Sequence, residues 1–336
     1  MAILAKTPVR IAFAGGGTDV EPYPSDYGGY VINSTINIHF RCMLTKRNDN
    51  LINLYSNDTF FPYKFDTIKI SNNNYQPSNL FEAIFYLVKP TLGMDVYVHG
   101  EPPKKAGLGA SASLCTCLIS GIFELEGKQI NLNNIAEDAY SVEQNILNNV
   151  GGRQDQYAAV YGGFNGLEFS GNSKVAIKKL KLSKSFKKEL EDNLILFYTG
   201  EPHTSGNIVR EQVKSYMENK EESKKSLDKL KSIAYLMRDA LLSENFELFG
   251  KLLTEDLINK KKFNPLLTTE YMENLNRLFL KHGGIGGRVC GAGGGGSMVW
   301  LIDPKRKKQI ESILEKQQGK LINFNFVEKG LEVLSI

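Results

Sequence analysis

The sequence predicts an α+β protein of two domains, residues 1–185 and 186–336. Its 336 residues exceed the roughly 250–300 at which a single hydrophobic core stops growing. The first half consists mainly of short apolar or alternating runs between turn signals, which is typical of a mostly antiparallel sheet. Residues 204–282 instead show almost continuous helical spacing of apolar side chains. The change from strands to helices near residues 180–190 sets the predicted boundary.

The strands predicted in the first domain are short apolar or alternating runs. In residues 39–46, for example, one face carries His39, Arg41, Met43 and Thr45. The expected strands are 9–14, 30–33, 39–46, 51–56, 94–98, 166–169 and 175–180. The polar, Asn-rich stretch 57–78 is expected to be a loop with at most one strand, at 64–70.

Four helices are predicted in the first domain. Residues 79–89 end at Pro90, which cannot continue a helix. Residues 111–125 place six apolar side chains on one face, and residues 133–148 begin at Asn133, a good N-cap residue. A short helix at 154–161 follows a Gly-Gly break.

The second domain is expected to open with a strand at 194–199 and to continue with about four amphipathic helices. Their breaks lie near Asn219, at 243–245 and at 264–265. A glycine cluster at 283–296 precedes an apolar strand at 297–302, and Asp303-Pro304 starts a Lys-rich helix. A strand at 321–327 closes the predicted fold.

Composition excludes several classes of protein. The 41 Lys and Arg against 37 Asp and Glu give a net charge of only +4, and the basic residues are spread along the chain, so no nucleic-acid partner is expected. The four cysteines form no C-x-x-C pair, which indicates reduced thiols and a cytoplasmic protein. No apolar run approaches 18 residues, so no membrane span is expected. The oligomeric state is not indicated.

Residues 102–113 have the composition of an anion-binding loop. Small residues allow the backbone to curve around a ligand, and the helix that follows directs free N–H groups towards it. Gly107-x-Gly109-x-x-Ala112 formally matches the dinucleotide fingerprint, but a second parallel strand with an acidic residue does not follow. No Gly-Lys-Ser/Thr occurs, which excludes a P-loop. A glycine/serine phosphate loop without a lysine remains.

Four sequence blocks occur in an order that resembles the GHMP family of small-molecule kinases. They are Thr7-Pro8-Val9-Arg10-Ile11 with Ala14-Gly15-Gly16-Gly17-Thr18-Asp19, then residues 107–113, then Glu143 with residues 151–157, and finally residues 291–296. The first and third blocks are similar to those of bacterial D-glycero-D-manno-heptose 7-phosphate kinases. One departure is Ala110, where relatives often carry Ser or Gly.

The resemblance implies a two-domain kinase fold with ATP and Mg²⁺ between an N-terminal ATP-binding domain and a C-terminal domain. Asp155 would face the acceptor hydroxyl with Arg10 beside it, and Ser111 and Glu143 would hold Mg²⁺. The expected ATP-binding residues are Gly107, Leu108, Gly109, Ala110, Ser111, Ala112 and Ser113. The expected substrate-binding residues are Gly16, Gly17, Thr18, Asp19, Gly293 and Gly294. The backbone of the glycine cluster 291–296 is expected to approach the ligand or the opposite loop, and the alternative is a flexible hairpin.

The resemblance further implies a sugar phosphate substrate, D-glycero-D-manno-heptose 7-phosphate. Phosphorylation of its anomeric hydroxyl would give a 1,7-bisphosphate for the synthesis of nucleotide-activated heptose. Candidates for the distal phosphate are Arg153, His203, Arg210 and Arg288, which the sequence does not rank. A kinase of the fucose or galactose type and a non-catalytic ATP- or sugar-binding homologue remain alternatives.

Overall fold

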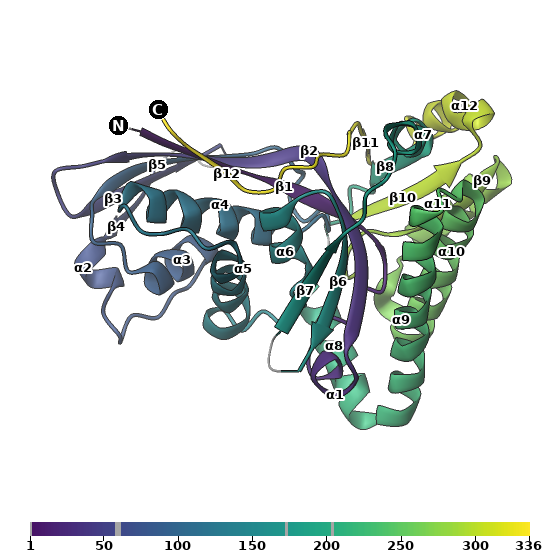
Figure 1. Ribbon diagram of the computed structural model, residues 1–336, viewed down its shortest axis with the longest axis horizontal. Helices are drawn as coiled ribbons and strands as arrows, with labels where there is room; N and C mark the ends of the chain where they lie inside the picture. Colours follow the sequence, from purple (N-terminus) through teal and green to yellow (C-terminus); the bar gives the residue numbers. More distant parts are fainter. Residues whose placement is uncertain (1, 58–61, 172–173, 203–204) are drawn as a thin grey trace.

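The computed structural model describes residues 2–57, 62–171, 174–202 and 205–336 (Figure 1). The first half provides seven strands of a large sheet to which the described residues contribute eight, and β12 comes from the second half. All pairings in this sheet except β3 with β5 are antiparallel. The strand order is β12-β1-β2-β5-β3-β4, and β6 pairs with both β2 and β7. The strands are β1 (Ala2–Ala14), β2 (Gly29–Lys46), β3 (Leu51–Ser56), β4 (Tyr63–Asp66), β5 (Met94–Gly100), β6 (Phe164–Ser170), β7 (Lys174–Lys179) and β12 (Glu332–Ser335). The prediction of a mostly antiparallel sheet is confirmed.

Helices cover one face of this sheet (Figure 1), and the buried apolar side chains between the helices and the sheet form the first of two large hydrophobic cores. The central helix α4 (Ala110–Leu125) packs on β1 and β2. Around it lie α2 (Thr67–Ile70), α3 (Leu80–Val88), α5 (Leu132–Ser141) and α6 (Gln154–Tyr161), and the short α1 (Tyr23–Tyr27) lies near β6. Because the start of α4 follows the phosphate loop directly, the core fixes where that loop lies.

The second half builds a four-stranded sheet, counted over the described residues, with helices around it. Its strand order is β11-β8-β10-β9. The strands are β8 (Leu194–Tyr198), β9 (Gly284–Val289), β10 (Ser297–Ile302) and β11 (Lys320–Ile322). The helices are α7 (Lys184–Asn193), α8 (Ser205–Glu218), α9 (Lys220–Leu242), α10 (Phe246–Phe263), α11 (Glu270–Lys281) and α12 (Lys307–Leu314), with 3-10 turns at Pro265–Leu267 and Pro304–Arg306. The predicted breaks at 219, 243–245 and 264–265 are confirmed.

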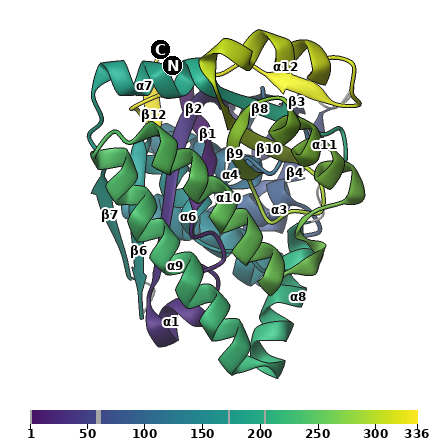
Figure 2. The ribbon, with the colours of Figure 1, turned by 90° about the vertical axis from the view of Figure 1, so that its right-hand side faces the viewer.

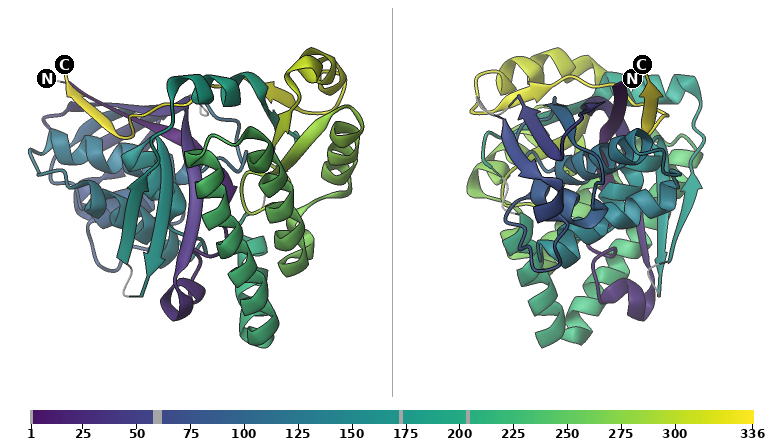
Figure 3. Two further views of the ribbon diagram at one scale, coloured as in Figure 1. Left: turned by 45° about the vertical axis from the view of Figure 1, so that its right-hand side comes forward. Right: turned by 90° about the vertical axis from the view of Figure 1, so that its left-hand side faces the viewer.

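The two halves meet along the long strands β1 and β2. Helices α9 and α10 run side by side (Figure 2), and α9 packs on both strands. The rings of Tyr30 and Tyr235 stack there with their centroids 4.2 Å apart. In the left view of Figure 3 the long strand β2 stands between the blue helices of the first half and the green helices of the second. The division at residue 185 stays a prediction, and β12 returns from the second half to pair with β1.

Several elements differ from those predicted. Residues 29–46 form one strand, and its first half is buried against both cores. The predicted strand 64–70 is wrong beyond Asp66, because the Asp66 side chain accepts hydrogen bonds from the N–H groups of Ile68 and Lys69 and caps α2. Helix α5 is capped by Asn131 rather than Asn133 and passes into a π-helical turn at Val142–Ile146.

Strand β9 lies inside the glycine cluster, where no strand was predicted. Its glycines are required by close packing: a Cβ on Gly286 would lie 1.8 Å from the Gly250 carbonyl oxygen, and one on Gly287 would lie 1.9 Å from the Trp300 indole ring. Helix α7 and strand β12 were not predicted either, and β11 is shorter than the predicted strand. All four cysteines are buried and unpaired. No helix within the described ranges is long and apolar enough to cross a membrane.

Candidate active site

A cavity of about 700 Å³ lies where the two halves meet. The first half contributes the end of β1, the turn after it, the phosphate loop and the segment before α6. The second half contributes α8, α10 and the loop after β9. Residues of all four sequence blocks therefore line the cavity, with Gly291 and Ala292 from the last block.

The phosphate loop enters α4 through two glycines with left-handed backbone. Gly107 has φ +72° and Gly109 has φ +75°, a conformation that side chains rarely adopt. A Cβ on Gly109 would also lie 3.2 Å from the Asp155 carboxyl group. The two glycines, Ala110 and Ser111 line the cavity. The other predicted loop residues, Leu108, Ala112 and Ser113, are buried behind it.

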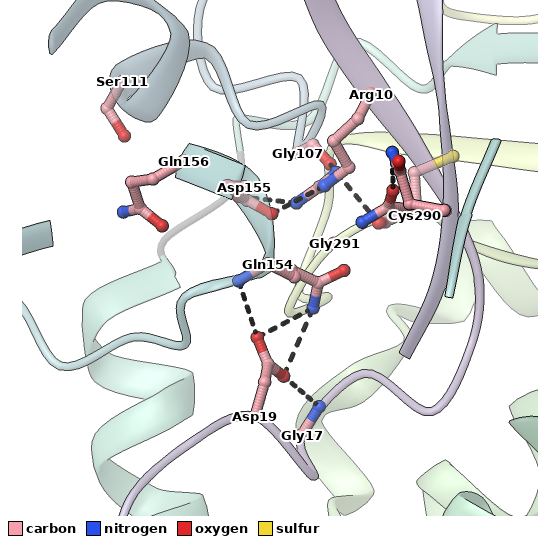
Figure 4. A network of polar contacts seen from close by, with 12 residues as sticks. Arg10, Gly17, Asp19, Gly107, Ser111, Gln154, Asp155, Gln156, Cys290 and Gly291 are labelled. Carbon is pink, nitrogen blue, oxygen red and sulfur yellow. Dashed lines mark hydrogen bonds and ion pairs between the residues drawn. The ribbon is translucent and has the colours of Figure 1, made fainter. Parts of the chain in front are cut away.

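Arg10 and Asp155 form a bidentate ion pair at the centre of the site (Figure 4). The guanidinium donates from Nε to Oδ1 and from Nη2 to Oδ2, both at 2.7 Å. Its Nη1 donates to the carbonyl oxygens of Gly107 at 2.7 Å and Cys290 at 3.2 Å. The Arg10 side chain is only 6 % exposed, so four hydrogen bonds hold it in one orientation and fix Asp155 against the phosphate loop.

Glu143 lies in the π-helical turn after α5, facing the start of α4. Its Oε1 accepts a hydrogen bond from the Ser111 hydroxyl, and its Oε2 accepts one from Gln156 Nε2 at 2.8 Å. Burial is the largest influence on this carboxyl and raises its pKa to about 7, with the negative charge of Asp155 adding to the effect. A cation beside Glu143 would therefore be favoured by a carboxylate that is otherwise costly to ionise.

Asp19 lies on the opposite wall, in the turn after β1. Its carboxylate accepts hydrogen bonds from Gly17 N at 3.0 Å and from both the backbone and side-chain nitrogens of Gln154 (Figure 4). Burial raises the pKa of Asp19. Gly16 and Gly17 line the cavity, whereas the Thr18 hydroxyl donates to the Gly15 carbonyl oxygen and belongs to the turn itself.

The glycine cluster approaches opposing loops rather than the cavity for much of its length. Gly291 lies against Gly107, where a Cβ on Gly291 would be 2.9 Å from the Gly107 carbonyl oxygen. Gly293 packs on Leu267 and Gly294 on Ile208, and neither lines the cavity. The structure thus gathers Arg10, Asp155, Ser111, Glu143, Gly16, Gly17 and Asp19 around one space, with Gly293 and Gly294 outside it. The roles of all these residues stay predictions.

Lys260 on α10 was missed by the sequence analysis. It lines the cavity, and burial followed by the positive charge of Arg288 lowers its pKa to about 8. In the sequence it begins the run Lys260-Lys261-Lys262, which has the pattern of a solvated helix end. Asp256 lies one turn earlier on the same face, but this spacing is also that of a solvated ion pair and does not signal burial.

Of the four candidates for a distal phosphate, Arg288 lines the cavity. Its guanidinium is paired with Asp256, with Nη1 2.9 Å from Oδ2. Arg153 instead lies over the Tyr140 ring and pairs with Glu21 and Glu137, and Arg210 donates to the Asn148 carbonyl oxygen. His203 lies outside the described residues.

Comparisons with known proteins find matches in both halves of the chain. The family "GHMP kinases N terminal domain" matches residues 79–163, and "GHMP kinases C terminal" matches residues 237–321. A D-glycero-alpha-D-manno-heptose 7-phosphate kinase of Campylobacter jejuni is 31% identical over 98% of both chains. A mevalonate kinase of Methanocaldococcus jannaschii is 26% identical over 96% of this chain and 98% of its own.

Among solved structures, a D-glycero-D-manno-heptose 1-phosphate kinase from Bacteroides thetaiotaomicron superposes with a TM-score of 0.82. It is 25% identical and the alignment covers 99% of each chain. The two family matches lie in the two halves that enclose the cavity, and the Campylobacter relative aligns along nearly the whole length. The chain therefore belongs to the GHMP kinase family and is an ATP-dependent phosphotransferase that acts on a sugar.

Proposed function

We propose that this kinase transfers the γ-phosphoryl group of ATP to the anomeric hydroxyl of D-glycero-D-manno-heptose 7-phosphate, giving the 1,7-bisphosphate. The observation that carries the proposal is the similarity to the D-glycero-alpha-D-manno-heptose 7-phosphate kinase of Campylobacter jejuni, which is 31% identical over 98% of both chains. The cavity supports it, because a sugar phosphate and the end of a nucleotide together need a space of several hundred Å³. The four unpaired cysteines support a reaction in the reducing cytoplasm, where ATP is present.

Asp155 is the proposed partner of the acceptor hydroxyl. Arg10 occupies one lone-pair direction on each of its oxygens, and a carboxylate offers about four such directions. An incoming hydroxyl can therefore donate to Asp155 while the ion pair remains intact. Arg10 keeps the carboxylate in place and presents a fixed positive charge next to the phosphate loop, where charge develops during transfer.

The Mg²⁺ that we propose for this reaction would be held by Ser111 and Glu143. Among the residues that the structure describes, no three His, Cys, Asp or Glu side chains gather into a metal site. The oxygens of Ser111 and Glu143 still fit Mg²⁺, because this ion commonly binds one or two protein oxygens and completes its shell with phosphates and water. When bound, the ion would neutralise charge on the phosphates of ATP. Gln156 orients the carboxylate through its hydrogen bond to Oε2.

The remaining walls divide between the two substrates. The N-terminus of α4 and the phosphate loop line the cavity, and no side chain caps the first turn of α4. The N–H groups of a helix start suit the ATP phosphates. Asp19, held by Gln154 and Gly17, is an acceptor for sugar hydroxyls. These assignments place the reacting atoms between Asp155 and the loop.

A substrate panel tests the proposal. Heptose 7-phosphate, heptose 1-phosphate, free heptose, fucose, galactose and mevalonate would each be incubated with ATP and Mg²⁺, and ADP release would be measured. We expect the highest kcat/KM with heptose 7-phosphate, and a new phosphorus signal coupled to the anomeric proton in NMR spectra of the product. Turnover of fucose or galactose without turnover of heptose 7-phosphate would refute the substrate assignment.

A further inference from the structure

Three nitrogen donors converge on one point of the cavity wall, directly above Gly16. A methyl group placed on Gly16 would lie 3.4 Å from Lys260 Nζ, 3.5 Å from Gln154 Nε2 and 3.8 Å from Arg288 Nη2. All four residues line the cavity. The absence of a side chain at Gly16 therefore leaves open a position that three nitrogen donors surround.

We call the position that these three donors surround the cradle, and both of its cations are buried. Lys260 is 5 % exposed and Arg288 is 1 % exposed. Asp256 fixes the arginine through Oδ2 and accepts a hydrogen bond from Gly15 N at 2.8 Å through Oδ1. The carboxylate therefore links the guanidinium to the turn that carries Gly16.

The donors of the cradle are not used up within the protein. Among the described residues, Lys260 Nζ donates to the Gly291 carbonyl oxygen at 3.2 Å, and an ammonium group has three hydrogens. Gln154 Nε2 has two hydrogens, and one of them is enough for its contact with the Asp19 carboxylate. Burial and the nearby Arg288 both disfavour the charged lysine, and a bound anion would reverse that cost. Two carboxylates act on Lys260: Asp256, which pairs with Arg288, and Asp19, which accepts hydrogen bonds from Gly17 and Gln154. Because both carboxylates have these other partners, the buried ammonium favours an anion over a neutral hydroxyl.

We propose that Lys260, Arg288 and Gln154 bind the non-reacting phosphate of the acceptor. The inference rests on the proposed function, which requires a sugar that already carries one phosphate. Asp19 lies beyond Gln154 and receives hydroxyl groups, so one glutamine separates the hydroxyl-binding wall from the phosphate-binding wall. Arg153 and Arg210 are directed to other partners and do not contribute.

The test compares the preference for a phosphorylated acceptor among four proteins. The measured quantity is the ratio of kcat/KM for heptose 7-phosphate to kcat/KM for free heptose, together with the KM for ATP. The proteins are the wild type, Lys260→Met, Gly16→Ala and Lys262→Met. Lys262→Met is the matched control, because it removes the same charge from an exposed position two residues along α10. Gly16→Ala keeps every charge and inserts a methyl group into the cradle at ordinary contact distances.

We expect the ratio to fall about 10- to 100-fold in Lys260→Met, which is the loss typical of one hydrogen bond to a charged group. Gly16→Ala should lower it as well, with a melting temperature near that of the wild type, and Lys262→Met should leave it unchanged. A ratio unchanged in Lys260→Met would overturn the inference. So would a raised KM for ATP at a constant ratio, because the cations would then serve ATP.

The outcomes for the wild type separate this inference from the proposed function. Turnover of heptose 7-phosphate with a preference independent of Lys260 would overturn only the inference. Turnover of a different sugar phosphate, with a preference that Lys260→Met abolishes, would overturn only the substrate assignment. Turnover of unphosphorylated sugars alone would overturn both.

Discussion

The Asp19 carboxylate, which is the proposed acceptor for sugar hydroxyls, occupies the space that a side chain at position 152 would fill. Gly152→Ala is therefore a sharp steric perturbation of the sugar-binding part of the cavity. A Cβ at this position would lie 1.9 Å from Asp19 Oδ2 and 2.3 Å from its Cγ. Neither Gly152 nor its neighbour Gly151 has a left-handed backbone, so alanine causes no conformational strain at either position. A Cβ on Gly151 would meet only the Asn149 carbonyl oxygen, at 3.9 Å. Gly151→Ala is therefore the matched control.

The expected effect follows from the distance. An ordinary contact begins near 3.4 Å, so the Asp19 carboxylate must move by about 1.5 Å, the difference between 3.4 Å and 1.9 Å. Such a shift breaks its hydrogen bonds to Gln154 at 3.2 and 3.3 Å. A displacement of about 1 Å in a substrate-positioning group can cost about 100-fold in rate. We therefore expect kcat/KM for the sugar to fall roughly 100-fold, or about 2.7 kcal/mol in the activation barrier.

Steady-state kinetics at saturating ATP give kcat/KM for the sugar, and a second series at saturating sugar gives the KM for ATP. The KM for ATP should stay within about threefold of the wild type, because Asp19 lies on the wall opposite Ser111 and Glu143. Circular dichroism melting would show whether the fold is retained. Equal sugar kinetics in Gly152→Ala and Gly151→Ala would refute the assignment of Asp19 to the sugar.

Four further predictions concern the catalytic pair, the metal site, the lysine and the second sheet. Asp155→Asn should lower kcat about 10²- to 10⁴-fold while substrate binding measured by calorimetry is retained, and a loss below tenfold would contradict its role. Because the pKa of Glu143 is raised to about 7, protons compete with Mg²⁺ at lower pH. The Mg²⁺ concentration for half-maximal rate should rise about tenfold per pH unit below 7, and Glu143→Gln should need more Mg²⁺ with no such pH dependence. The pKa of Lys260 is about 8, so its ammonium is lost as the pH rises through that value, and the KM for the sugar phosphate should increase above pH 8 in the wild type but not in Lys260→Met. The charged groups that act on this lysine are Arg10, Asp19, Asp256 and Arg288. Finally, Gly286→Ala should lower the free energy of unfolding in urea by about 1–3 kcal/mol or more, because its Cβ would overlap the Gly250 carbonyl oxygen, and an unchanged urea midpoint would contradict the packing of β9.

Local patterns in the sequence predicted most of the helices, because amphipathic spacing, caps and breakers act within one segment. The ends of α9 and α10 at Asn219, Ser243–Asn245 and Asn264 illustrate this. Elements that depend on distant partners were missed. β9 is a strand because it pairs with β10, and its glycines leave room for α10 and Trp300. Nothing within the segment 284–289 signals these contacts. β12 is a strand because it pairs with β1 at the other end of the sequence.

The residues of the site were likewise predicted where the sequence signal is local and missed where it depends on distant partners. Arg10, Ser111, Glu143 and Asp155 were found because they stand in short blocks that resemble a family, and the structure brings them around one cavity. Lys260 was missed because its surroundings are assembled from Gly16, Arg288 and Gly291, which are far from it in the sequence. A buried lysine cannot be told from a solvated one by its immediate neighbours when those neighbours are also lysines.

The pairing of β12 with β1 has a consequence for synthesis on the ribosome. β1 emerges before β12, and β12 emerges only after the second half has been made, so one side of β1 lacks its hydrogen-bonding partner while the residues between the two strands are made. An unpaired strand edge is a template for association with other nascent chains. Lys6 lies on this edge and contacts Glu332 in the folded protein, with Nζ 3.4 Å from the carboxylate. Until Glu332 arrives, its unpaired charge protects the strand that carries Arg10 against aggregation.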